Sequence, residues 1–429
     1  SLGIQNSGAV RIVEQDALTL GPITTASLID ITAGGAVTST AALTSTAAFT
    51  IDSTGNDIAL TGNNALSGAL TLNGNNINLN NGVATNFASV NAASLTVTSA
   101  GDITQAGAIT GLTATTATLN APGRNVTLNH AGNDFNDLRI TAGAVTVTDG
   151  NRIDSGSITA DCVTLNTATG IGSANTEGLP TGAFVTNTAS LTVDNGSGGV
   201  YITNNRAATV NITNRGEIGF VNNGHLTIDR LYTAGAEVDD RRQFRNVLLN
   251  VNGGSIYGVP LSSSGPRTIN NTPDITATNL SVYVFGGGMG TEARRVSINV
   301  PETFGYYGLT RAYVHYYGGE PRAVIGTTDL INASTYDFLA SLRLLEVESL
   351  ESFDPAIFTE VRNYYYEDVA ILMPADQRLD AADEDKAGPE QPKEKEGKAT
   401  CAGQAEAGTG REPGVDACPD PKERTGKSS

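Results

Sequence analysis

The chain has 429 residues and a formal net charge of −18; 39% of its residues are hydrophobic, 6% are aromatic and none is tryptophan. Its 49 glycines and many small polar residues do not suit the bulky core of a compact globule. Every lysine lies at or beyond Lys386, and a net-negative chain without basic stripes is not expected to bind nucleic acid. No run of 18 apolar residues is present, so no helix is expected to span a membrane.

A short phrase returns along the first half of the chain. It consists of an apolar-Thr-apolar stretch, a few small polar residues with glycine, and a second alternating apolar run, as in 51–58 and 97–103. Its first apolar positions are 31, 51, 72, 97, 119, 140, 165, 193 and 212, in steps of 19 to 28 residues. Strand-like alternation at this period is typical of a stacked solenoid, because one repeat cannot bury its apolar face alone. We therefore predict an all-β fold, a right-handed parallel β-helix whose coils are about 4.8 Å apart.

The pattern divides the chain into four parts. Residues 1–235 hold the regular repeat, and residues 236–333 keep the strands but add longer polar loops, as irregular terminal coils. Residues 334–373 have helical spacing of apolar residues and two helix start signals, so a small helical cap over the open sheet edge is expected. Residues 374–429 are charged and proline-rich, which predicts a disordered tail. Because Ser1 falls in mid-phrase, we expect the chain to be a fragment of a longer polypeptide.

An enzyme is the alternative to a structural role, because β-helices also carry polysaccharide lyases and glycoside hydrolases. Asp239 and Asp240 are adjacent carboxylates, and paired carboxylates can serve as acid and base. However, His225 precedes this pair, the reverse of the order in galacturonases, and His130 and His315 have no triad partners at a readable spacing. We interpret the acidic pair and the two arginines that follow it as a solvated loop with local ion pairs. No catalytic residue, metal site or cofactor is expected.

Five tyrosines gather near the end of the irregular coils: Tyr306, Tyr307, Tyr313, Tyr316 and Tyr317. Aromatic faces stack on sugar rings, so this group is a candidate glycan-binding site. The alternative is ordinary packing, since tyrosines at alternating positions of a terminal strand can lie under a cap.

Three cysteines are present. Cys162 stands alone at an alternating position of the repeat and is interpreted as a small buried hydrophobe. Cys401 and Cys418 both lie in the predicted tail, where the further ligands of a zinc site are not at hand. A disulfide loop formed in an oxidising compartment is the preferred interpretation of this pair. Such a loop would thicken the very end of the chain.

Three features together carry a family resemblance: the Thr/Asn/Gly repeat, the segment 353–374 (FDPAIF through NYYYEDVAILMP) and the terminal pair Cys401 and Cys418. With them, most of the chain resembles the C-terminal portion of two-partner-secretion exoproteins, the filamentous-haemagglutinin-like adhesins of Gram-negative bacteria. The resemblance implies a right-handed parallel β-helix exported through a dedicated outer-membrane barrel. In surface-retained members, a C-terminal cysteine hook lodges in that barrel, a role that would fall to Cys401 and Cys418.

The resemblance also implies a function and a location. It indicates a non-enzymatic adhesin or matrix scaffold, of the kind found in biofilms, that is secreted or held at the cell surface and outer membrane. The expected partners are the transporter barrel and a polysaccharide or host-cell receptor.

Overall fold

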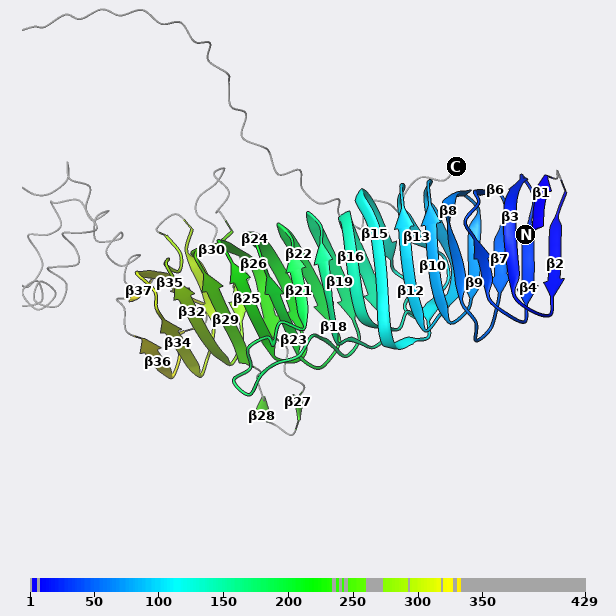
Figure 1. Cartoon of the computed structure of the whole chain (residues 1–429). Coiled ribbons are helices and arrows are strands. Elements are labelled where there is room, and N and C mark those ends of the chain that lie inside the picture. The colour runs from blue at the N-terminus through cyan, green and yellow to red at the C-terminus, as the bar shows by residue number, and fades with distance from the viewer. Residues whose placement is uncertain are drawn as a thin grey trace, which may run out of the picture. The chain divides into compact units, whose positions relative to one another are not determined.

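The computed structural model describes residues 2–5, 8–233, 237–238, 241–242, 246–259, 273–291, 294–317, 319–326 and 330–332. These residues form a parallel β-solenoid of about 15 turns (Figure 1). They belong to the first of two compact units, Ser1–Tyr336. The predicted helical cap and the predicted tail lie outside the described residues.

Secondary structure in the described part of the chain consists of strands. The N-terminal coils contain β1 (Leu2–Gln5), β2 (Val10–Glu14), β3 (Leu18–Thr25), β4 (Ile29–Ala33), β5 (Val37–Ser39), β6 (Leu43–Ser45), β7 (Phe49–Asp52), β8 (Ile58–Leu66), β9 (Ala69–Asn73), β10 (Asn76–Asn81), β11 (Thr85–Asn91), β12 (Ser94–Ser99), β13 (Ile103–Gln105) and β14 (Ile109–Thr110). The central coils contain β15 (Leu112–Leu128), β16 (Phe135–Asp149), β17 (Arg152–Ile153), β18 (Ser155–Thr159), β19 (Cys162–Thr167), β20 (Gly170–Ile171), β21 (Phe184–Asn187), β22 (Ser190–Asn195), β23 (Val200–Asn204), β24 (Ala208–Asn214), β25 (Ile218–Asn223) and β26 (Leu226–Thr233). The C-terminal coils contain β27 (Glu237–Val238), β28 (Arg241–Arg242), β29 (Asn246–Asn252), β30 (Ile256–Gly258), β31 (Ile275–Thr276), β32 (Asn279–Phe285), β33 (Val296–Asn299), β34 (Thr303–Tyr307), β35 (Ala312–Tyr316), β36 (Ala323–Gly326) and β37 (Leu330–Asn332).

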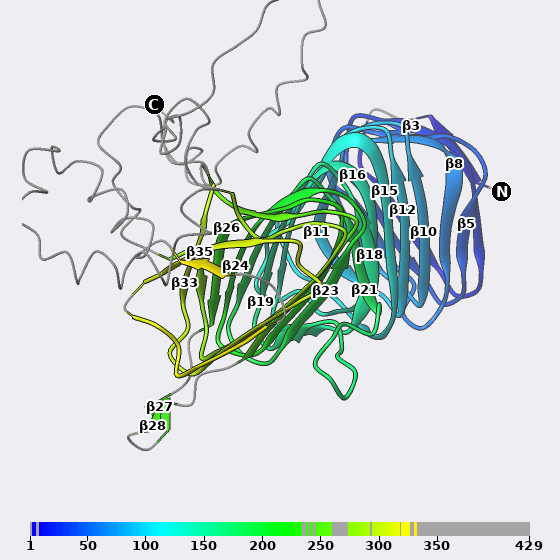
Figure 2. The same cartoon turned by 90° about the vertical axis from the view of Figure 1, so that its left-hand side faces the viewer.

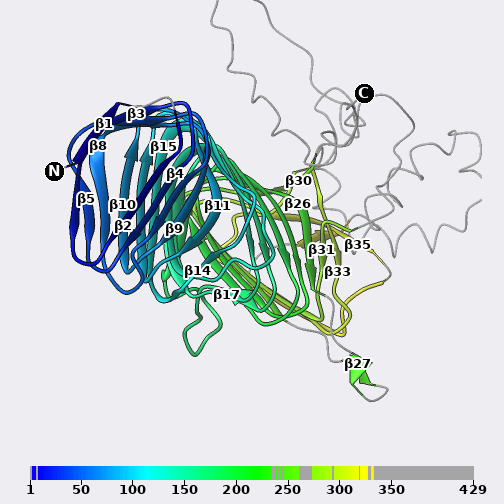
Figure 3. The same ribbon diagram turned by 90° about the vertical axis from the view of Figure 1, so that its right-hand side faces the viewer.

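Most strands of the stack pair in parallel with their equivalents in the coils before and after them. The series β4, β7 and β9, for example, places Ile31 opposite Ile51 and Ile51 opposite Leu72. Among the described strands, only β27 and β28 form an antiparallel strand pair, and it lies outside the stack (Figure 2). The prediction of one parallel solenoid is therefore confirmed for the described residues, and Figure 3 shows the coils following one another without a break in the sheet.

The nine predicted apolar positions all face the interior, and each is at most 2% exposed. They do not form one row, however. Leu72 is followed in its own row by Val90, whereas Val97 belongs to a different strand row that continues to Leu119. The longer steps, from 72 to 97 and from 140 to 165, therefore mark changes of strand within a coil. The predicted repeat is therefore present, but its nine apolar positions are distributed over three strand rows, one row after another.

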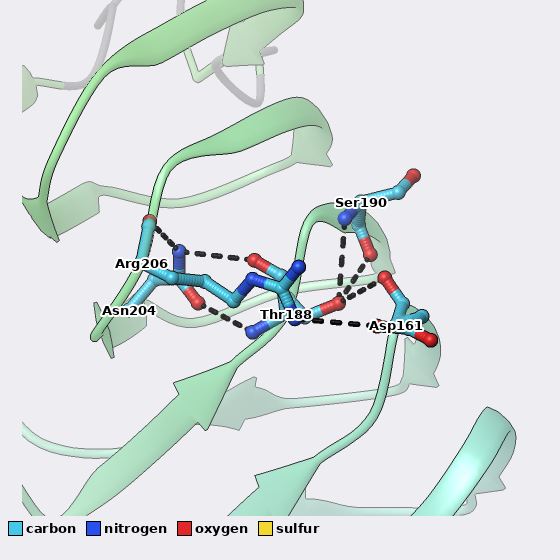
Figure 4. Close-up of polar contacts among 5 residues, drawn as sticks. All are labelled: Asp161, Thr188, Ser190, Asn204 and Arg206. Carbon is cyan, nitrogen blue, oxygen red and sulfur yellow. Dashed lines mark hydrogen bonds and ion pairs between the residues drawn. The ribbon is translucent and has the colours of Figure 1, made fainter. Parts of the chain in front are cut away.

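Buried polar side chains hold the corners of the coils together, as Figure 4 shows for one corner. The Asn204 amide donates to the Arg206 carbonyl at 2.6 Å, while its oxygen accepts the Thr188 amide N–H at 3.0 Å. The Thr188 hydroxyl lies 2.9 Å from the carbonyls of Asp161 and Ser190. On the outside of the buried Asn204 and Thr188 side chains, Arg206 and Asp161 form an exposed ion pair at 3.2 Å. These contacts satisfy the backbone groups that a turn leaves outside the strand ladder.

One excursion interrupts the regular coils. The 28-residue step from Leu165 to Val193 contains a loop at 172–183, between β20 and β21. Its backbone folds back on the outer face of the next coils, where the Gly178 carbonyl oxygen would lie 2.4 Å from a Cβ atom at Gly219. Gly178 also lies near the side chain of Leu248, one coil further on. The loop therefore covers part of one outer face, and a glycine at 219 makes that close approach possible.

Candidate functional site

Strands β26, β30, β31, β33 and β35 of the C-terminal coils lie side by side in Figure 3. Tyrosine and arginine side chains of β26, β30 and β35, and of the residues just before β33 and β35, lie on their outer surface. We call this surface the arginine–tyrosine face, with Arg230, Tyr232, Tyr257, Arg294, Arg311 and Tyr313 as its members. Strand alternation directs these side chains outward while Val314, Leu231 and their equivalents point inward.

The five predicted tyrosines do not form one surface. Tyr306 is 6% exposed and Tyr316 is 8% exposed, because both stand at interior positions of their strands. Burial raises the pKa of Tyr316, and Glu320 and Tyr306 push it in the same direction. Among the described residues, no hydrogen-bond partner reaches the Tyr316 hydroxyl oxygen. These two side chains belong to the core, so a glycan could meet only the other three.

The outward tyrosines lie on two different faces. Tyr307 stacks on Tyr283 of the preceding coil, with ring centroids 4.9 Å apart and planes at 21°. One face of the Tyr307 ring is thus used inside the protein, as a rung of an aromatic ladder. Tyr313 instead points outward on β35, on the arginine–tyrosine face, and Tyr317 follows directly after that strand and is half-buried.

Arginines lie over tyrosine rings at three places on the arginine–tyrosine face. The guanidinium carbon is 4.7 Å from the ring centroid in the pair Arg230 and Tyr232, and 4.7 Å in the pair Arg294 and Tyr257. In the third pair, Arg311 lies 5.9 Å from the ring of Tyr313 and donates to its hydroxyl at 3.1 Å. Stacking of this kind orders an arginine and leaves its edge available to acceptors. The members of two pairs stand only two residues apart in the chain, whereas Tyr257 and Arg294 are 37 residues apart. The i, i+2 spacing of arginine and tyrosine is the sequence signal that could have identified the two short-range pairs.

Two carboxyl groups are buried among the described residues. Burial raises the pKa of Asp274 to about 6, against hydrogen bonds from Ser297, and the nearby charge of Asp229 adds to the increase. Burial likewise raises the pKa of Asp149 to about 6. The oxygens of Asp149 accept backbone N–H groups, from Phe135 at 2.7 Å and from Asn151 at 2.8 Å. In both cases the carboxylate satisfies backbone or side-chain donors at a corner of the coil.

The histidines considered for an enzyme occupy different coils, and Asp239 and Asp240 lie outside the described residues. His225 accepts the backbone N–H of Ser255 at 3.1 Å, and His130 accepts that of Gly132 at 3.0 Å, both through Nδ1. His315 points outward at β35. Within the part of the chain that the structure describes, no three His, Cys, Asp or Glu side chains are grouped to hold a metal ion.

Cys162 is not the buried hydrophobe that the sequence suggested. It stands at the outward phase of β19 and is half-buried, whereas the alternate residues Val163 and Leu165 fill the core. Cys162 is disulfide-bonded in the structure. Cys401 and Cys418 lie outside the described residues, so the predicted loop between these two stays a prediction.

No helix among the described residues has the length and apolarity needed to cross a membrane.

Comparison with known proteins gives one match. No curated protein and no solved structure matches the chain. Two adjoining segments, residues 7–73 and 74–141, match a family described as repeats of unknown function (DUF5649). The first segment contains strands β2 to β9, and the second contains β10 to β15 and the start of β16. About a third of this chain, at its N-terminal end, is therefore similar to that repeat family.

Proposed function

We propose that this chain is part of a bacterial adhesin or matrix scaffold, secreted or exposed at the cell surface. The observation that supports this most is the unbroken parallel pairing from β1 to β35 and its continuation to β37. A stack of this kind keeps a long outer surface at a fixed spacing of about 4.8 Å per coil. Such a surface suits contacts with an extended polymer or a cell better than the enclosure of one small substrate.

Hydrogen-bonded ladders along the outer surface support the same proposal. Asn252 donates to Asn223 at 3.0 Å, and Asn223 donates to Asn205 at 2.8 Å, one coil at a time. Asn73 is linked in the same way to Asn91 and to Asp52. These ladders stiffen the shaft from outside, because each exposed amide is held by its equivalent one coil away. A stiff shaft is what a protein needs to display a binding surface away from the cell.

The proposal includes an anchor. A disulfide between Cys401 and Cys418 would make the end of the chain thicker than a single extended strand and hold it in the outer-membrane barrel of a two-partner-secretion transporter. The helical cap at 334–373 and the right-handed winding of the coils belong to the same proposal.

The test is surface retention in a Gram-negative host that expresses the full-length protein with its transporter. Cys401→Ser and Cys418→Ser should each move protein from the cells into the medium, as measured by immunoblotting of both fractions. Cys162→Ser separates the two possible pairings: the anchor predicts an unchanged distribution, whereas a shift into the medium would show that the disulfide of Cys162 is needed for retention. If both tail variants stay on cells as well as the wild type does, the anchor is wrong.

A β-helix polysaccharide lyase or glycoside hydrolase is the alternative function. It predicts turnover of a pectin-type or host glycan by the purified protein. Loss of that turnover in Asp239→Asn or Asp240→Asn would replace the scaffold proposal with the enzyme.

A further inference from the structure

The arginine–tyrosine face has a fixed geometry around Arg294. Its Nε donates to the Gly258 carbonyl at 3.2 Å, and its Nη2 donates to the Thr227 hydroxyl at 3.1 Å. The Tyr257 ring lies beneath the guanidinium, and His225 lies beside that ring with centroids 5.7 Å apart. Two hydrogen bonds and one aromatic face therefore fix the plane of the guanidinium before any ligand arrives.

The coils set the distance between Tyr257 and Tyr313. Met289 bridges Ile256 on one side and Ala312 on the other, so the next residue, Gly290, lies between Tyr257 and Tyr313 in one outward row. Two coil steps separate the tyrosines, which is about 10 Å. Gly290 has φ +74, and a Cβ atom there would lie 2.4 Å from the Tyr313 carbonyl oxygen. The row thus has a tyrosine, a position without a side chain, and a second tyrosine, with an arginine at each ring.

The charge of this face differs from that of the whole chain. The chain carries a net charge of −18, whereas three arginines of these coils, Arg230, Arg294 and Arg311, each lie over a tyrosine ring. Arginine on an aromatic ring remains charged and presents N–H groups in a plane that matches a carboxylate or sulfate. Tyrosine rings beside it offer apolar surface for the C–H face of a sugar.

We infer that the arginine–tyrosine face binds an acidic polysaccharide, with carboxylates or sulfates of one glycan chain at Arg294 and Arg311. This inference deepens the proposed function, since it names the class of glycan that the scaffold would hold. A charged polymer can meet arginines on successive coils at once, so modest single contacts add to a firm attachment. Nucleic acid is the other polyanion with this chemistry. Its higher charge density would be repelled more strongly by the acidic remainder of the chain.

The experiment measures binding of the purified full chain to polygalacturonate, to neutral dextran and to a DNA duplex by biolayer interferometry at two salt concentrations. We expect binding to polygalacturonate alone, weaker at high salt. Arg294→Gln and Arg311→Gln should each weaken it by roughly tenfold, since a hydrogen bond to a charged group is lost. Arg294→Lys should recover only part of the affinity, because lysine keeps the charge but not the planar fork.

Arg322→Gln is the matched control. Arg322 is an exposed arginine of the same terminal coils, but it pairs with Glu302 at 3.3 Å. Its variant should bind as the wild type does, and circular dichroism checks that every variant keeps the β fold. Absence of binding to polygalacturonate, equal binding of all variants, or equal affinity for dextran or DNA would each overturn the inference. Because the assay uses isolated protein, its outcome is separate from surface retention, which tests the anchor.

Discussion

Asn204 and Asn222, which stand 18 residues apart in the chain, form one hydrogen bond of a ladder inside the solenoid: Nδ2 of Asn204 donates to Oδ1 of Asn222 at 2.9 Å. Both side chains are fully buried. Asn195 and Asn214 repeat the arrangement in another row at 2.7 Å. Each amide also satisfies the backbone of its own turn, so the ladder joins the coils at the points where the strand hydrogen bonds end.

Replacing Asn204 with alanine should destabilise the solenoid markedly. The change leaves the buried Thr188 N–H and the Arg206 carbonyl without their side-chain partner. Each unsatisfied buried group costs about 1–3 kcal/mol, so the free energy of unfolding should fall by about 3 kcal/mol. Urea denaturation followed by circular dichroism measures the change.

Asn205→Ala provides the control for this prediction. Asn205 is exposed, and its oxygen accepts a hydrogen bond from Asn223 at 2.8 Å in the outer ladder. Water can replace that bond, so the loss should stay below about 1 kcal/mol. Equal losses in the two variants would show that the buried ladder adds no more stability than the exposed one.

Much of this fold could be predicted from the alternation of apolar residues, because interior and exterior positions of a strand differ by one residue. Val200 and Ile202 face inward, and Asn204 stands in the same phase. Asparagine is usually a surface residue, so composition alone suggests that it faces water. The phase of the strand predicts the opposite, and the structure follows the phase. The division of the period among three rows was not predictable, since the turns that separate strands vary in length.

The candidate site was harder to predict. Tyr313 and Tyr316 stand at opposite phases of β35, so Tyr313 faces outward and Tyr316 faces the core. Tyrosines that are close in the sequence therefore lie in two different environments. Arg294 and Tyr257 meet only because a bridge at Met289 sets the row between two coils. No local pattern in the sequence records that neighbourhood.

The stability of the solenoid should depend on pH through Asp149. Burial raises its pKa from the ordinary 3.8 to about 6, and a raised pKa means that the folded chain holds the proton more tightly than the unfolded chain does. The stabilisation is complete below pH 3.8 and is lost as the pH rises through about 6. Relative to Asp149→Asn, the wild type should therefore gain stability between pH 7 and pH 4, as measured by urea midpoints across that range.

Asp194→Asn gives the background for the pH experiment, since Asp194 faces outward on β22. Its midpoints show the general effect of removing one negative charge from an acidic chain. A difference between the wild type and Asp149→Asn that stays constant from pH 7 to pH 4, or follows the Asp194→Asn profile, would refute a special role for Asp149.

Gly219→Val should release the 172–183 loop without unfolding the coils. A Cβ atom at 219 would lie 2.4 Å from the Gly178 carbonyl oxygen and 2.9 Å from the Tyr201 ring, so the loop must move away. Limited proteolysis should then cut within the loop several times faster, while the far-ultraviolet circular dichroism stays unchanged. Thr203→Val is the control. Thr203 lies on the same outer face, at the next outward position of β23 after Tyr201. Equal cleavage of the two variants would show that the loop is not held at Gly219.

The pairing of the three cysteines can be settled by one peptide map. Cys162 is assigned to a disulfide, and the only other cysteines of the chain are Cys401 and Cys418, so a disulfide at Cys162 within one chain excludes the proposed loop between those two. A pair 17 residues apart in one segment closes a short loop easily, which favours the proposed pairing of Cys401 with Cys418. The proposed anchor therefore predicts that non-reduced digests of the exported protein contain a peptide that links Cys401 to Cys418. A peptide that links Cys162 to either tail cysteine would instead fasten the tail to β19, and the anchor in the transporter barrel would have no loop to hold it.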